Sequence, residues 1–416
     1  MAEFRINHLL KSHLDDDGIS VKHLLELLNL EDNLTQQLLK ALSIEKYEDD
    51  FIKISGANKL VQIQKGINKR YYKEDLACSL NDITIYNGED FALQFHNLDR
   101  SEHFSQLNVP YLTANTKYSS RNDFFSWYYG MDKYASELMK NGMDSILHQN
   151  IELLKSYDIA GQERKYRILH DSLDNKYYVR AIISMERYNN YDNNITIVIA
   201  LLSLHKKMIE ESVTYSLNRV EYNESCIKIF FEEDGKRKLG ELGYVKNVIQ
   251  VSNDEVKRES LKFEAISSIE FIDSNKEQQE IIIQPSFSNH PKVETTILAI
   301  AHNLGSDKFA KKLEEIESSV DKHDDLYNLI NKISEIKDPL QILFLVKQMI
   351  KNARNEGVKQ HRAQLQRILD THVVKNMIQL LTVFKKMDLV TENDIEASEY
   401  IRYIIYQSLI EKKSTR

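Results

Sequence analysis

The sequence predicts an α+β protein in which helices at both ends of the chain flank a central, mainly antiparallel sheet. Alternating apolar residues indicate strands between residues 83 and 283, and apolar residues at helical spacing indicate helices at both ends. Only 12 Gly and 4 Pro occur in 416 residues, so boundaries must follow changes of pattern rather than flexible linkers. We therefore expect an N-terminal module (1–66), a central α+β domain (67–290) and a C-terminal helical domain (291–416).

The N-terminal segment has the element order of a winged helix. Leucines recur at helical spacing in its first part, and alternation around a Gly-containing turn indicates a hairpin in its second part. The expected elements are helices Glu3–Leu14, Ser20–Leu28 and Leu34–Ser43, followed by strands Phe51–Ile54 and Leu60–Gln64. The third helix offers Gln36, Gln37 and Lys40 instead of a basic row, and the segment holds 8 basic against 11 acidic residues. This balance favours a structural or protein-contacting module over a DNA reader.

Strand-like alternation begins at Ile83 and recurs after Gln162, where turn residues such as Asp174–Asn175 separate the segments. We expect strands at Tyr166–His170, Tyr177–Ser184, Thr214–Val220, Cys226–Glu232, Val245–Val251, Leu261–Ile272 and Gln279–Ile283. One helix, Ile195–Glu211, interrupts this sheet. Asp192, Asn193 and Asn194 stand just ahead of the helix, and we expect them to provide an Asx N-cap.

From Val293 onward the pattern is helical, with an apolar seam and no fixed repeat. The seam includes Ile316, Leu326, Leu329, Ile330 and Ile333, and then the stretches Leu343–Ile350, Leu365–Leu369, Val373–Phe384 and Ile395–Ile410. This pattern predicts a helical bundle that packs on the sheet domain, or partly on another copy of the chain.

The composition favours a cytoplasmic protein without a metal or cofactor. Cys78 and Cys226 are far apart and lack Cys/His ligand spacing, so neither a disulfide framework nor a structural zinc is expected. The first residues lack the apolar core of a signal peptide, and the longest apolar run, Ile195–Leu204, is about half a membrane span. The net charge of −8 permits only a local basic patch. The common phosphate-loop, dinucleotide, zinc-protease, serine-hydrolase and kinase motifs are missing, which disfavours those enzyme classes.

A run of short motifs in the central domain joins a predicted strand, a helix start and a later strand end. The residues that carry these motifs are Arg180, Ser184, Arg187, Tyr188, Asp192, Asn193, Ser252, Asn253, Asp254 and Glu255. A Pro-containing turn at Leu107–Tyr111 and a helix with Trp127 precede them. Between residues 90 and 290 this arrangement resembles the phage/plasmid-like protein family called domain of unknown function nine-three-two. The resemblance implies a protein of a phage, plasmid or genomic island, and it implies no particular chemistry.

Two positions depart from the family's pattern. Asn108 stands where the family usually has Gly, a change that the turn tolerates because Asn adopts positive φ more readily than most residues. Phe271–Asn275 stands where the family usually has a strand ending in Cys-x-Asn-Gly. This second departure puts any function tied to the Cys-x-Asn-Gly segment in doubt.

The motif residues admit a functional and a structural interpretation. Arg180 and Ser184 share one strand face, from which they can meet an anion or a partner backbone. An enzyme site would need four side chains to converge in one pocket, those of Arg180, Arg187, Tyr188 and Asp254. In the structural interpretation, Asp192–Asn193 caps a helix, Ser252–Asp254 forms an Asx turn at a strand end, and Arg180 pairs with a buried carboxylate. We favour the structural interpretation, because cap and turn residues need no ligand.

Two acidic stretches invite a metal-site interpretation, and both are better explained as turns. Glu233–Lys236 echoes the acid-x-Lys end of metal-dependent nucleases, but its Asp-Gly pair is typical of a hairpin turn. Asp15–Gly18 lacks the spaced oxygen ligands and the terminal Glu of an EF-hand loop. We therefore expect no bound metal.

The clearest electrostatic feature is a basic stretch at residues 347–367. Its basic residues are Lys347, Lys351, Arg354, Lys359, Arg362 and Arg367, and its only acidic residue is Glu356. In a continuous helix, Lys347, Lys351 and Arg354 would form one stripe, which can follow the phosphates of DNA or RNA. Gly357 could break this helix, and a basic run is also typical of the solvent-facing side of an amphipathic helix.

These observations lead to three functional hypotheses. The first is a non-enzymatic, cytoplasmic protein of a mobile genetic element that associates with DNA or RNA through the basic stretch. The second is an interaction or assembly protein of phage–host conflict, in anti-phage defence or host takeover, that forms a homo-oligomer or binds a phage or host protein. The third is an enzyme with a site on the central sheet.

Overall fold

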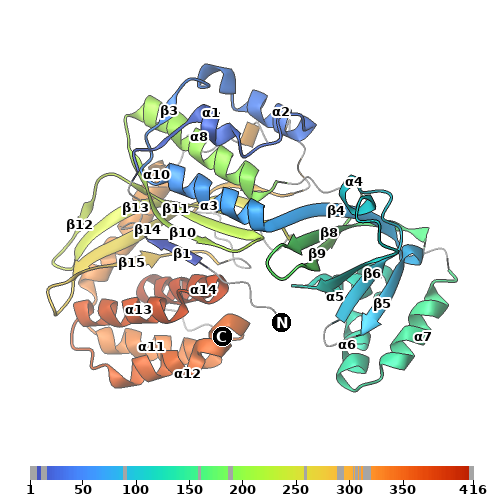
Figure 1. The fold of residues 1–416 in the computed structure, drawn as a ribbon. Coiled ribbons are helices and arrows are strands. Elements are labelled where there is room, and N and C mark those ends of the chain that lie inside the picture. Colours follow the sequence, from blue (N-terminus) through green and yellow to red (C-terminus); the bar gives the residue numbers. More distant parts are fainter. Residues whose placement is uncertain are drawn as a thin grey trace. The chain divides into compact units, whose positions relative to one another are not determined.

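The computed structural model describes residues 7–10, 16–87, 91–157, 161–185, 191–256, 260–287, 295–302, 304, 308, 311–312 and 320–411. The expected α+β class is confirmed, with antiparallel sheets in the middle of the chain and helices toward its C-terminus (Figure 1). The chain forms two compact units: unit 1 contains Ile63–Asn190, and unit 2 combines Phe4–Gln62 with Tyr191–Arg416. This division differs from the expected segments 1–66, 67–290 and 291–416, because the middle of the chain contributes to two separate sheets.

The N-terminal segment does not form the expected winged helix. Residues Asn7–Leu10, expected to be helical, form strand β1, which pairs antiparallel with β10 (Tyr215–Tyr222). The expected second hairpin strand, Leu60–Gln64, lies inside helix α3 (Ala57–Arg70). The elements between them are β2 (Ile19–Ser20), α1 (Val21–Leu25), α2 (Asn33–Ala41), the 3-10 helix Ile44–Lys46 and β3 (Phe51–Ile52), which pairs with β2.

Local sequence explains why α3 is a helix. Ala57, Leu60 and Val61 are buried and follow helical spacing, which a short alternating window can imitate. The Asp16 carboxylate accepts hydrogen bonds from two backbone N–H groups at the start of α3, those of Gly56 at 2.9 Å and Lys59 at 3.0 Å. Asp16 therefore caps α3. It belongs to the stretch Asp15–Gly18, which was expected to be a turn.

Unit 2 is built on an eight-stranded antiparallel sheet. Its strands follow the order β1-β10-β11-β13-β14-β15, with β12 beside β13 and β16 beside β14. The remaining strands are β11 (Cys226–Glu233), β12 (Arg237–Leu239), β13 (Gly243–Asp254), β14 (Leu261–Ile272), β15 (Gln278–Ile283) and β16 (Thr296–Ile300). Alternation predicted β10, β11, β13, β14 and β15, but β16 was expected to be helical and instead pairs with β14.

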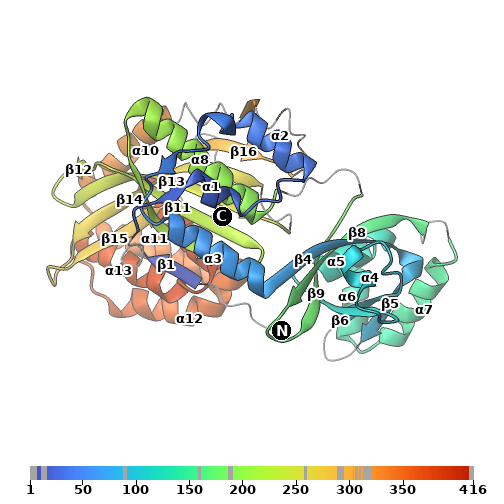
Figure 2. The same cartoon turned by 45° about the horizontal axis from the view of Figure 1, so that its top comes forward.

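Helix α8 (Asn193–Glu211) covers one face of this sheet. Its Ile197 belongs to the same apolar core as Ile229 of β11, Val251 of β13 and Leu24 of α1. The helix therefore lies between the sheet and the N-terminal helices, as Figures 1 and 2 show. This position explains why α8 is apolar on nearly all sides.

The C-terminal helices α13 (Met377–Thr391) and α14 (Ile395–Tyr406) cover the opposite face. Strand side chains alternate, so Phe230 points away from its core-facing neighbour Ile229. The Phe230 ring centroid lies 5.2 Å from the guanidinium carbon of Arg402 in α14. The predicted packing of a helical bundle on the sheet is therefore confirmed.

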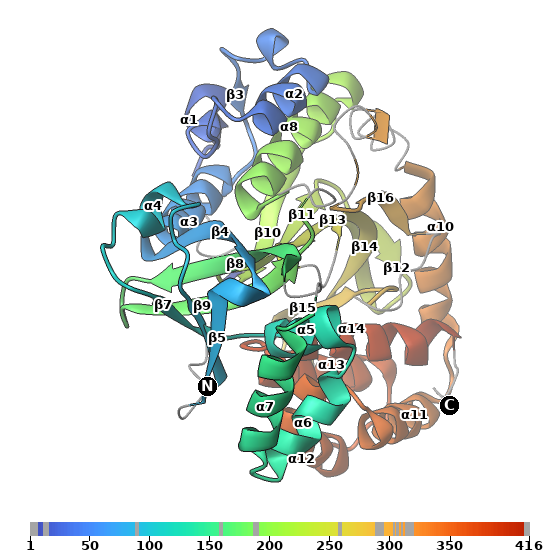
Figure 3. The same ribbon diagram turned by 90° about the vertical axis from the view of Figure 1, so that its right-hand side faces the viewer.

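Unit 1 contains a six-stranded sheet with the order β4-β8-β9-β7-β6-β5, in which β7 and β9 pair in parallel and the other pairs are antiparallel. Its strands are β4 (Tyr71–Ser79), β5 (Ile83–Asn87), β6 (Phe91–Phe95), β7 (Leu112–Thr116), β8 (Glu163–Asp171) and β9 (Lys176–Ile183). Helix α4 (Glu102–Ser105) precedes β7. Three longer helices share an apolar core with the sheet and lie together in Figure 3; they are α5 (Ser120–Tyr129), α6 (Asp132–Lys140) and α7 (Asp144–Leu154).

Two expectations on unit 1 have clear outcomes. The predicted strands Tyr166–His170 and Tyr177–Ser184 form, but they belong to this sheet and not to the sheet of unit 2. Asn108 has a φ of 51°, so it adopts the left-handed conformation that its turn was expected to need.

Candidate functional site

The basic stretch forms two helices rather than one. Helix α11 (Pro339–Asn352) ends before Arg354, and α12 (Glu356–Thr371) begins after Asn355, whose side chain accepts a hydrogen bond from the Val358 backbone N–H at 3.0 Å. The predicted stripe therefore keeps Lys347 and Lys351 on α11, while Arg354 lies in the connection. Gly357 does not break the helix, because it lies within α12; the break falls at residues 353–355, where Asn355 caps the new helix.

Half of the basic side chains in this stretch already have partners. Lys347 Nζ lies 3.1 Å from Oδ1 of Asp370, which follows the stretch 347–367 in the sequence. Lys359 pairs with Glu356, and the Arg362 guanidinium donates a hydrogen bond to the backbone carbonyl of Ala353. The Lys347–Asp370 pair and the Arg362–Ala353 hydrogen bond join α12 to α11, whereas the Lys359–Glu356 pair lies within α12. All three contacts reduce the charge that is available to an outside ligand.

The other three basic side chains, those of Lys351, Arg354 and Arg367, are exposed. None of the three has an acidic partner among the residues that the structure describes. The Lys347–Asp370 contact shows which residues of the two helices lie side by side. Lys351 lies four residues closer to the connection than Lys347, and Arg367 lies three residues closer than Asp370. Lys351 and Arg367 therefore lie at about the same level of the antiparallel pair.

The motif residues of unit 2 converge on the start of α8. The Asp192 side chain accepts a hydrogen bond from the Ile195 backbone N–H at 2.9 Å, so the predicted N-cap is confirmed. The Asn253 side chain donates to Asn193 Oδ1 at 3.0 Å, and Glu255 Oε1 accepts from the Asn193 backbone N–H at 3.1 Å. These contacts tie the end of β13 to the start of the buried helix.

The remaining motif residues are not part of this cap. Asp254 forms the expected Asx turn, because its side chain accepts a hydrogen bond from the Val256 backbone N–H at 2.8 Å. Ser252 is buried on the other face of β13. Arg180 is buried in β9 and Ser184 follows that strand, so both belong to unit 1. Arg187 and Tyr188 lie outside the described residues.

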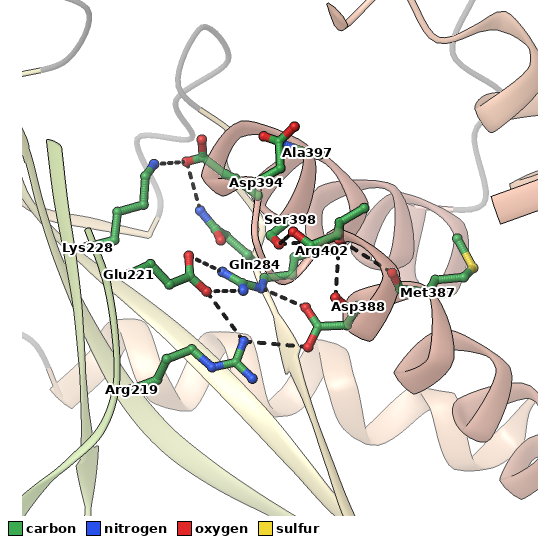
Figure 4. Close-up of polar contacts among 12 residues, drawn as sticks. Arg219, Glu221, Lys228, Gln284, Met387, Asp388, Asp394, Ala397, Ser398 and Arg402 are labelled. Atoms are coloured by element: carbon green, nitrogen blue, oxygen red, sulfur yellow. Dashed lines mark hydrogen bonds and ion pairs between the residues drawn. The ribbon is translucent and has the colours of Figure 1, made fainter. Parts of the chain in front are cut away.

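Sequence reasoning missed a buried charge cluster between the sheet and α13–α14, which we call the Arg402 cluster (Figure 4). Its members are Arg219 and Glu221 of β10, Asp388 of α13 and Arg402 of α14. The Arg402 guanidinium forms a bidentate pair with Glu221, in which Nη1 lies 3.1 Å from Oε2. Its Nε lies 3.3 Å from Asp388 Oδ1. Two positive and two negative side chains thus balance within the interface.

Arg219 completes the Arg402 cluster. Its Nη1 lies 3.4 Å from Glu221 Oε1 and 3.5 Å from Asp388 Oδ2. Burial alone would raise the pKa of Asp388, but the two arginines outweigh that effect and hold the pKa at about 2. Burial would likewise lower the pKa of Arg402, but Glu221 and Asp388 keep it above its usual range. Asp388 and Arg402 therefore stay charged at neutral pH.

A second buried pair lies on the same face of the sheet. Lys228 Nζ of β11 lies 2.7 Å from Glu399 Oε1 of α14, and both side chains are about 2% exposed. Glu399 also accepts a hydrogen bond from the Gln284 side chain at 3.2 Å. This pair is also balanced, so its two charges offset each other inside the interface.

The acidic turn at Glu233–Lys236 lines a cavity of about 370 Å³, together with Glu232 and Lys246. Lys246 Nζ lies 3.0 Å from both Glu232 Oε1 and Glu270 Oε2, and Lys236 Nζ lies 2.9 Å from Glu270 Oε1. The lysines of this cavity are therefore neutralised by neighbouring carboxylates. Across the described parts of the chain, no group of three or more His, Cys, Asp or Glu side chains is placed to hold a metal ion.

No family model matches the chain, and no significant match exists among curated proteins or solved structures. The resemblance to the phage/plasmid-like family therefore stays a prediction from the motif residues. Within the described residues, no helix is both long enough and apolar enough to span a membrane.

Proposed function

We propose that the protein is a non-enzymatic protein of a phage, plasmid or genomic island that associates with nucleic acid through helices α11 and α12. The observation that carries the binding proposal is the exposed group of Lys351, Arg354 and Arg367, which lacks acidic partners among the described residues. Residues 339–371 hold six basic side chains against two acidic ones, in a chain whose net charge is −8. Such a local excess on an acidic protein favours phosphate contact at one surface. The resemblance in the central domain supports the genetic setting.

The surfaces expected for an assembly role are used inside the chain itself. Leu24 and Leu38 of the N-terminal helices belong to the apolar core that contains α8. The C-terminal seam, including Val346, Leu365 and Leu380, is buried within the helical bundle. These apolar residues therefore have their partners already, and the exposed basic side chains carry more of the functional argument than the seam does.

A binding titration tests this proposal. Purified protein is titrated into labelled single-stranded DNA, duplex DNA and RNA at 50 and 200 mM salt, and fluorescence anisotropy is recorded. Three phosphate contacts predict that affinity falls roughly 20-fold for single strands and roughly 40-fold for duplex DNA between these salt concentrations. The triple variant Lys351→Glu, Arg354→Glu, Arg367→Glu is expected to lose this salt-sensitive binding.

The control carries the same charge change in unit 1. Lys133, Lys140 and Lys176 are exposed lysines, and their triple substitution by Glu lowers the net charge by the same amount. Binding that survives in this control and disappears in the α11–α12 variant would assign the phosphate contacts to that surface. Equal loss in both variants would instead indicate a general charge effect and would contradict the proposal.

A further inference from the structure

We propose that the nucleic acid bound by α11–α12 is single-stranded, and that one of its bases stacks on Phe344. This inference rests on the proposed function and adds the class of ligand. Phe344 and Leu340 lie on α11 with 62% and 57% of their surfaces exposed. An exposed aromatic ring beside unpaired cations is the combination that single-strand binding surfaces use.

The helix geometry aligns the ring with the basic side chains. At 100° per residue, positions 340, 344, 347 and 351 fall within a sector of about 60° on α11. Leu340 and Phe344 occupy the N-terminal half of this stripe, and Lys347 and Lys351 the C-terminal half. The rise per residue puts Phe344 and Lys351 about 10 Å apart along the axis. One strand can therefore place a base on the ring while its backbone continues past the lysine.

Phe344 is not needed for the core of the bundle. The buried side of α11 is supplied by Ile342, Leu343, Val346, Met349 and Ile350. The exposed phenyl ring on the basic stripe gives a ligand with an apolar face a surface on which to stack. Unpaired bases offer such a face, whereas the bases of a duplex are already stacked on each other.

The test compares a labelled 20-nucleotide oligo(dT) with the same strand in a duplex, using wild-type protein and variants at Phe344. The wild type is expected to bind the single strand more tightly. Loss of one stacked base predicts that Phe344→Ala weakens single-strand binding about 5- to 150-fold, with the salt dependence unchanged. Phe344→Tyr is expected to keep the affinity, and Phe344→Leu, which keeps bulk without a ring, is expected to lose it. Leu389→Ala is the matched control and is expected to keep the affinity, because Leu389 is an exposed apolar side chain (49%) on α13 and does not belong to this stripe.

A spectroscopic signal separates stacking from a general loss of affinity. The chain has one tryptophan, Trp127, so Phe344→Trp adds a second tryptophan, which lies on α11. Its emission is expected to be quenched by oligo(dT) beyond any change seen with the wild type. Unchanged emission at saturating oligo(dT) would overturn the stacking contact.

The outcomes distinguish the two proposals. Salt-sensitive binding that is the same in Phe344→Ala overturns the single-strand inference and leaves the proposed function intact. Absence of binding to single strands, duplex DNA and RNA overturns both. An apolar and basic stripe also fits an anionic membrane surface, so vesicles with phosphatidylserine form a further arm. Binding to these vesicles without binding to oligo(dT) would likewise overturn both.

Discussion

Removal of the Arg402 side chain is expected to destabilise unit 2 strongly. Arg402 and Glu221 are almost fully buried and form a bidentate pair, so Arg402→Met leaves one carboxylate without its main partner in the interior. Breaking a buried pair in this way costs about 3–5 kcal/mol. Arg219 still contacts both Glu221 and Asp388 and offsets part of the loss, so we expect a cost of about 3 kcal/mol.

The assay is urea denaturation followed by far-ultraviolet circular dichroism, with Glu221→Met and the double variant completing a cycle. Each single substitution leaves a charge uncompensated, whereas the double substitution removes both charges. The double variant should therefore cost less than the sum of the single variants by at least about 2 kcal/mol. Lys22→Met is the matched control, because Lys22 and Asp49 form an exposed ion pair in the same unit, and no shift of its midpoint is expected.

Two results would refute this reasoning. A cost below about 1 kcal/mol for Arg402→Met would show that the interface readily relaxes or admits water around Glu221. Additive costs in the cycle would show that Arg402 and Glu221 do not stabilise each other, despite their geometry.

Two further stability predictions concern single groups. His323 in α10 (Val320–Asn331) is buried, and burial, followed by Lys207 and Arg237, lowers its pKa from 6.5 to about 4. Protonation of His323 therefore does not reduce the free energy of unfolding above about pH 6.5, and it lowers that free energy by about 3 kcal/mol as the pH decreases to about 4. Urea titrations of the wild type and of His323→Gln across this pH range measure the difference. Asp16→Ala removes the cap of α3 and should cost about 1–2 kcal/mol and speed hydrogen exchange in the first turn of α3; unchanged exchange there would argue against a capping role.

The local pattern predicted most strands of unit 2, but it did not predict which strands share a sheet. Leu261–Ile272 was predicted with the same bounds that the structure shows, because its alternation continues over 12 residues. The pairing of β1 with β10 joins segments about two hundred residues apart, and no local pattern contains that contact. Leu60–Gln64 was wrong as a strand because five residues can satisfy both periods, and only the Asp16 cap and the buried helix face decide between them.

The candidate surfaces were predictable to different degrees. The basic stretch was recognisable as an excess of Lys and Arg, although Asp370, which pairs with Lys347, lies outside residues 347–367. Phe344 stands seven positions before Lys351, so the sequence places both on one side of a helix. Its exposure could not be predicted, because it depends on which side of α11 packs into the bundle. Sequence periodicity gives the two faces of a helix, and tertiary packing decides which apolar residues remain outside.

The buried charges were not predictable either, because strand alternation does not show whether the polar face of a sheet is covered. Polar residues alternate with apolar ones on β10 and β11, and alternation of this kind is typical of an antiparallel sheet with one face in water. In this protein α13 and α14 cover that face, so Glu221 and Lys228 are buried and need partners of opposite charge. Helix α14 supplies these partners as Arg402 and Glu399. In the sequence alone, both residues resemble the solvent-facing side of an amphipathic helix. Swapping which helix residue meets which strand residue would bring like charges together, because Glu221 would face Glu399 and Lys228 would face Arg402. The charge order on the two elements therefore favours one alignment of the helices on the sheet, which apolar contacts alone would specify less sharply.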